Sequence, residues 1–239
     1  MTQLMLLAAF YGIAAGILIP RVAYRLAVEP ETPWRAICPQ GHPIRTWAGP
    51  ARCATCTTPY GPSVFPITLT TALGCALLAH VTGPRPELMV WLLAAPVLVL
   101  LGVIDLTAHR LPDVLTLPLA VSALAGLGVA ALLPGAGGSF TGALGGMLAL
   151  AGGYFVLFLF SPRSLGFGDV KLALALGAVL GWYGWTSLVA GAMAAQVLAG
   201  VYALALLMFR KASRTSSIPF GPFLAGGTLL GVLLGAAGA

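Results

Sequence analysis

Acidic residues are scarce in this sequence. Only 6 Asp and Glu stand against 12 Lys and Arg in 239 residues, and charged residues make up 8% of the chain. Soluble globular domains carry roughly 25% charged residues, so the composition excludes an ordinary soluble enzyme and a disordered chain. The net charge of +6 does not predict a nucleic-acid partner, because the positions of the basic residues account for it in another way.

The sequence instead contains long apolar runs, and its mean hydropathy is +0.98. A membrane-spanning helix needs about 20 apolar residues to cross about 30 Å of hydrocarbon. Seven uncharged stretches approach or exceed this length: residues 2–20, 66–82, 88–104, 114–133, 140–160, 172–209 and 218–239. The sixth of them is long enough for two helices joined by a turn at residues 181–185.

These runs predict an all-α polytopic membrane protein with about eight transmembrane helices. The first helix lies within residues 1–25, a small cytosolic loop domain occupies residues 26–65, and residues 66–239 form a seven-helix membrane domain embedded in the lipid bilayer. Helices and closed β-barrels both satisfy every backbone polar group in lipid, and the alternating pattern of a barrel is absent from this sequence.

The basic residues predict the orientation of these helices. With the N-terminus outside, only Arg85 of the 12 Lys and Arg residues falls clearly on the external face, and Lys171 lies beside a cytosolic segment. Cytosolic loops carry such an excess of Lys and Arg. The predicted cytosolic segments are residues 21–65, 105–113, 161–169 and 210–217.

Three aspartates stand at the predicted cytosolic ends of the helices: Asp105, Asp113 and Asp169. The three glutamates fall in loops, and Glu87 lies in a short external one. An ionisable group at or below the membrane surface costs free energy, so it is a candidate functional residue whose partner should be identified.

Two carboxylates in a poorly solvated site can share one proton. The ionised group activates a water, and the protonated group donates to a carbonyl oxygen and later to the leaving amine. This is the aspartic protease arrangement, in which Asp169 would pair with Asp105 or Asp113. Gly166 and Gly168 would leave room for an extended peptide. Alternatively, Asp105 is an interfacial acid, and Asp113 is the N-cap of the following helix.

Several motifs now form a recognisable set. Ile-Asp-Leu at 104–106 precedes Leu-Pro-Asp at 111–113, Gly-Phe-Gly-Asp-Val-Lys-Leu occupies 166–172, and Ile-Pro-Phe-Gly-Pro-Phe occupies 218–223. Tyr-Arg-Leu at 24–26 also matches. In this order, the sequence resembles the type IV prepilin peptidases, bifunctional membrane leader peptidases and N-methyltransferases with a GxGD motif.

The resemblance implies that Asp105 and Asp169 are the catalytic pair. Asp113 matches the second acid of the first motif, outside the pair, and lies near the substrate together with Gly166, Gly168 and Lys171. The implied reaction removes the basic leader of a prepilin or pseudopilin at the cytosolic face of the bacterial inner membrane. A proton-coupled transporter is the alternative, but it would favour acids near the middle of the bilayer. A third hypothesis is a peptidase-like scaffold that only binds such substrates. The presence of both Asp105 and Asp169 argues against it.

The predicted loop domain contains a Cys/His pattern. Members of the family carry two C-x-x-C pairs here, but Gly41 stands where the first pair should end, and His42 follows it. A Cys3His set can hold zinc tetrahedrally, and the alternative is a loop that has lost its metal. The predicted ligands are Cys38, His42, Cys53 and Cys56. In the family this loop is associated with methylation by S-adenosylmethionine, which the resemblance implies as a second cofactor.

Overall fold

The computed structural model describes residues 1–29, 31–161, 165–209 and 218–238. Eight α-helices form within these ranges, so the predicted all-α architecture is confirmed. The long sixth apolar run divides as predicted, at a turn in which Gly184 has a φ of +101°. The helices are α1 (Thr2–Leu26), α2 (Val64–Thr82), α3 (Leu88–Ala108), α4 (Asp113–Ala131), α5 (Phe140–Phe160), α6 (Phe167–Trp182), α7 (Trp185–Met208) and α8 (Gly221–Ala237).

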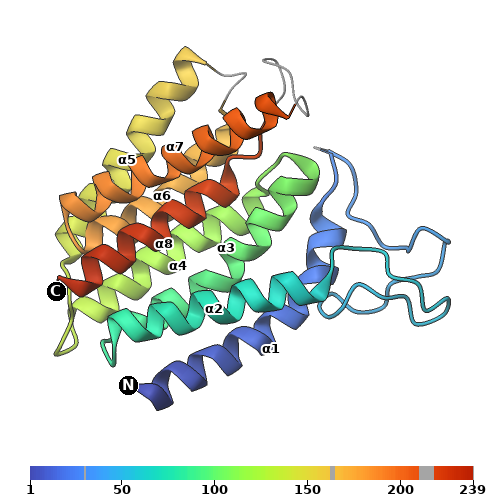
Figure 1. Ribbon diagram of the computed structural model, residues 1–239, viewed down its shortest axis with the longest axis horizontal. Helices are drawn as coiled ribbons and strands as arrows, with labels where there is room; N and C mark the ends of the chain where they lie inside the picture. Colours follow the sequence, from blue (N-terminus) through green and yellow to red (C-terminus); the bar gives the residue numbers. More distant parts are fainter. Residues whose placement is uncertain (30, 162–164, 210–217, 239) are drawn as a thin grey trace.

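The helices pack as one bundle with a loop domain extending from one end. Figure 1 shows α1 and α2 side by side at one edge and α5 and α7 at the other, with α3, α4 and α8 between them. The segment after α1 projects beyond the end of the bundle. The catalytic candidates Asp105, Asp113 and Asp169 belong to the same end, because α3 finishes there and α4 and α6 begin there.

Six of the helices in the described ranges are long and apolar enough to cross a membrane, whereas α6 and α8 are shorter. Helix α6 has 16 residues, which corresponds to about 24 Å. Nearly all of its residues from Asp169 to Trp182 are buried, so α6 is enclosed by other helices instead of lipid. Its short length therefore keeps Asp169 inside the protein.

Glycines bring α5 and α6 into close contact. Gly142 and Gly146 on α5 face Gly181 and Gly177 on α6, and a Cβ at Gly177 would lie 2.4 Å from the Gly146 carbonyl oxygen. Small residues four apart are the pattern by which membrane helices approach closely. This contact fixes the position of the helix that carries Asp169.

Substitution of Gly177 by Ala should destabilise the protein. The new methyl group would also lie 2.9 Å from the Met147 Cα, and overpacking of this kind costs about 1–3 kcal/mol. We expect a lower midpoint of thermal unfolding in detergent. Gly152→Ala on α5 is the matched control, because no atom lies within 4 Å of the Cβ it would add; equal midpoints for the two variants would contradict the close contact.

The loop domain is held on the end of α1 by arginines. Arg21 donates to the Tyr60 hydroxyl at 3.0 Å and to the Pro50 carbonyl at 2.9 Å. Arg25 is buried, donates to the Ile44 carbonyl at 3.1 Å, and lies 3.9 Å from the centre of the Trp47 ring. These predicted topogenic charges thus also bind the loop. Four others, Arg163, Arg210, Lys211 and Arg214, lie outside the described residues.

Candidate active site and metal-binding loop

Asp105 lies in the last turn of α3 and is buried. Its Oδ2 atom accepts a hydrogen bond of 2.8 Å from the Gly221 backbone N–H, which opens α8. A helix N-terminus offers unpaired N–H groups and a positive partial charge, so it stabilises a carboxylate. The Pro-Phe-Gly-Pro run therefore brings the start of α8 against Asp105. A Cβ at Gly221 would lie only 3.0 Å from the same oxygen.

Asp169 lies in the first turn of α6 and is 7% exposed. Its Oδ2 atom accepts a 3.1 Å hydrogen bond from the Gly166 N–H. An acid three residues after the N-cap makes this bond in a capping box. The GxGD sequence thus fixes the carboxylate at the start of the helix.

The two carboxylates approach each other from different helices. Asp105 and Asp169 lie close enough to interact electrostatically. Leu111 packs between the two helix starts: a Cβ at Gly168 would lie 3.0 Å from the Leu111 Cβ, and one at Gly221 would lie 3.2 Å from its Cδ2. The space that Gly168 leaves is therefore filled by Leu111. This packing holds the starts of α6 and α8, and with them the two acids, on either side of one side chain.

Asp113 does not cap α4. The helix begins at Asp113 itself, Pro112 takes the N-cap position, and no side-chain cap forms, so the N-cap interpretation is wrong. The Asp113 Oδ2 atom instead accepts from the Lys171 Nζ at 2.6 Å. The Asp113 side chain is 58% exposed. The pair links the start of α4 to α6 at the rim of the site.

Tyr154 on α5 belongs to the same site, although the sequence did not single it out. Its side chain is 3% exposed, and among the described residues its hydroxyl has no hydrogen-bond partner. The hydroxyl interacts electrostatically with Asp169, and the ring centre lies 5.9 Å from that of Phe220. The available signal was one hydroxyl-bearing aromatic residue in the middle of an apolar run.

The four Cys/His side chains of the loop domain come together. Their candidate ligand atoms all lie within 4.8 Å of one another. Two turns carry them, each closed by an isolated β-bridge, Ile37 with Pro43 and Arg52 with Pro59. The first turn is tight because Gly41 has a φ of +83°, and this conformation places His42 beside Cys38.

The separations in this cluster fit a tetrahedral metal site. The Cys38 Sγ atom lies 3.6 Å from the His42 Nδ1 atom and 4.0 Å from the Cys56 Sγ atom. Zinc–sulfur bonds of about 2.3 Å and zinc–nitrogen bonds of about 2.0–2.1 Å require about 3.6 Å between S and N and about 3.8 Å between two S atoms. Backbone N–H groups of Cys56 and Thr55 lower the pKa of the Cys53 thiol to about 6, which favours the thiolate that binds metals. A Cys3His metal site fits these residues.

The loop domain also reaches the turn between α3 and α4. Arg110, within that turn, donates a 2.9 Å hydrogen bond to the Val28 carbonyl at the start of the loop. The loop domain with its Cys/His cluster and the two aspartates therefore belong to one end of the molecule.

Comparisons with known proteins agree with this arrangement. The profile described as "Type IV leader peptidase family" matches residues 92–209, which contain both aspartates. A protein of Aeromonas salmonicida (strain A449) is 32% identical over 80% of this chain and 68% of its own length. One of Pseudomonas putida is 30% identical over 96% of this chain and 90% of its own length. Each carries the name prepilin leader peptidase/N-methyltransferase.

No solved structure matches the chain significantly. The motifs, the approach of Asp105 to Asp169 and the relatives all point the same way. The chain therefore belongs to the type IV leader peptidase family.

Proposed function

We propose that this protein is a membrane aspartic endopeptidase that removes the basic leader of prepilin-like proteins. The approach of Asp105 to Asp169 at one end of the bundle carries the proposal. One carboxylate takes a proton from the attacking water, and the other polarises the scissile carbonyl and then protonates the departing amine. The names of the relatives support prepilins as the substrates.

The same end of the bundle faces the cytosol in this proposal. Arg21, Arg25 and Arg110 cluster there with the loop domain, whereas Arg85 donates to the Ala236 carbonyl at the other end. This distribution follows the positive-inside rule, and it supports a site at the inner face of a bacterial inner membrane. A transporter is not favoured, because the three aspartates gather at one end and the buried Glu87 lies at the other end of α3, with no acid between them among the described residues to form a path across the bundle.

Co-expression with a prepilin-like substrate tests the proposal. We expect the wild-type protein to shorten the substrate, and mass spectrometry should locate the cut at the end of the basic leader. A substrate that keeps its leader in the presence of inserted, folded protein would contradict the proposed function.

The metal in the loop domain is most simply a structural zinc ion held by Cys38, His42, Cys53 and Cys56. It would supply folding free energy to a loop with few apolar residues. Methylation of the new N-terminus is the second activity that the relatives' names support. Mass spectrometry of the mature substrate would detect one added methyl group.

Substitution of Tyr154 by Phe should lower kcat and leave KM nearly unchanged. The hydroxyl has no partner among the described residues, so its loss breaks no hydrogen bond in the resting protein, whereas a hydrogen bond to a charged group during the reaction contributes about 1.5–3 kcal/mol. We expect kcat to fall roughly 10- to 100-fold. Tyr202→Phe on the exposed side of α7 is the control. An unchanged kcat in the Tyr154 variant would show that this side chain contributes to packing and not to the reaction.

A further inference from the structure

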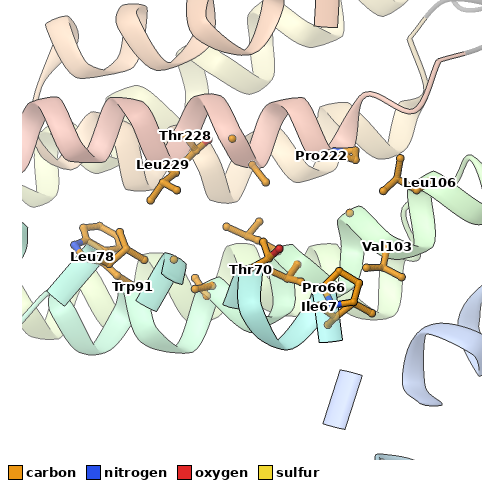
Figure 2. Close-up of a pocket in the computed structure, with 18 of the residues that line it drawn as sticks. Pro66, Ile67, Thr70, Leu78, Trp91, Val103, Leu106, Pro222, Thr228 and Leu229 are labelled. Carbon is orange, nitrogen blue, oxygen red and sulfur yellow. The ribbon is translucent and has the colours of Figure 1, made fainter. Parts of the chain in front are cut away.

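An apolar groove of about 520 Å³ runs along α3 between α2 and α8. Figure 2 shows Thr228 and Leu229 of α8 on one wall, with Thr70 and Leu78 of α2 opposite them. On α3 the lining extends from Trp91 to Thr107, which is about 24 Å at 1.5 Å per residue. The groove is therefore long enough to hold some 16 residues of a helix.

One end of this groove lies beside Asp105, next to residues that contact it. Leu106, which lines the groove, directly follows Asp105 in α3. Pro222, on the opposite wall (Figure 2), follows Gly221, whose N–H donates to the Asp105 carboxylate. Neither aspartate lines the groove, but its lining at this end directly adjoins Asp105 and Gly221, and from there it extends toward the other face of the bundle.

The lining has the chemistry of a helix-binding surface. It is almost entirely apolar, and Gly74, Gly102 and Gly226 contribute small residues from three different helices. Small residues let another helix approach closely in a membrane. No atom lies within 4 Å of a Cβ added at Gly74, so this position opens into free space.

We propose that this groove binds the apolar helix that follows the leader of the substrate. The inference rests on the proposed function. The helix lies along α3, and the bond to be cut lies at the Leu106 and Pro222 end, beside Asp105. A peptidase must hold the chain on one side of that bond within reach of its carboxylates, and this groove begins there. A lipid acyl chain would fill the same volume, but it has no need to end at the catalytic aspartate.

Photocross-linking tests the occupant directly. A photoreactive amino acid is placed at Gly74 in the Asp105→Asn protein, so that intact substrate is retained, and the membranes contain a prepilin-like substrate. The matched control carries it at Gly200 on α7, which is exposed and has no atom within 4 Å of its added Cβ. We expect a substrate adduct from position 74 and none from position 200. Adducts to lipid alone at position 74, or equal substrate adducts from both positions, would overturn the proposal.

Filling the groove gives a second readout. In Gly74→Leu, the ratio of kcat/KM for the full-length substrate to that for a short peptide without the apolar helix should fall about tenfold, as overpacking implies. In Gly200→Leu the ratio should keep its wild-type value. An unchanged ratio in Gly74→Leu would overturn the proposal that the groove binds the substrate helix, and it would leave the proposed peptidase activity unaffected. If the wild-type protein cuts neither substrate, the proposed function fails, whereas the cross-linking result still decides the groove.

Discussion

Replacing either Asp105 or Asp169 by Asn should lower the rate of leader removal by about a thousandfold or more. In the proposed mechanism each acid acts in a pair whose members depend on each other, and removal of one member of such a unit costs nearly as much as removal of the whole. Asn keeps a carbonyl oxygen to accept the N–H of Gly221 or Gly166. The fold should therefore survive while the chemistry is lost. The measurement is the initial rate of cleavage of a purified prepilin-like substrate.

Two control variants sharpen this test. Glu29→Gln removes an exposed carboxylate in the loop domain and should leave the rate unchanged. Asp113→Asn breaks the exposed ion pair with Lys171; because such pairs contribute about 0–1 kcal/mol, the rate should stay within about tenfold of wild type. A thousandfold loss in Asp113→Asn together with an active Asp105→Asn would assign the pair to Asp113 and Asp169.

Removal of the metal ligands should unfold the loop domain and leave the helical bundle folded. A structural zinc ion contributes about 10–16 kcal/mol to the folding of small domains, and no large apolar core replaces it here. We expect about one zinc ion per chain by elemental analysis, and almost none in Cys53→Ser. Limited proteolysis should then cut the loop, while the circular dichroism of the helices persists.

Cys75 provides the matched control for the metal. It is buried in α2, away from the cluster, so Cys75→Ala should retain zinc and resist proteolysis in the loop. A metal-free wild-type protein whose loop is equally resistant would show that the loop folds without an ion.

Local patterns in the sequence predicted the elements that depend on neighbours in the chain. The apolar runs predicted the eight helices because length and hydropathy decide most of them, and the turn at residues 181–185 divides the longest run. The spacing of His42 after Cys38 predicted their contact because one tight turn joins them. The distribution of basic residues likewise predicted that the three aspartates lie at the same end of the helices.

Contacts between distant segments could not be predicted in this way. Asp113 forms an ion pair with Lys171 instead of capping its own helix, and the two residues are 58 positions apart. The N–H of Gly221 meets Asp105 from 116 positions away. Glu87 looked like an exposed loop acid, yet it is fully buried and accepts from the Gly137 N–H at 3.1 Å. Each of these pairings depends on how the helices pack. The sequence of either segment alone does not indicate which partner its side chains will meet.

The arginines at the end of α1 serve the protein at two different times. In the proposed orientation, Arg21 and Arg25 resist translocation during insertion and so select one orientation of the helix. After the loop closes, its carbonyl groups accept their N–H bonds. The side chains proposed to select the orientation of α1 are therefore the same ones that afterwards hold the loop domain on its end.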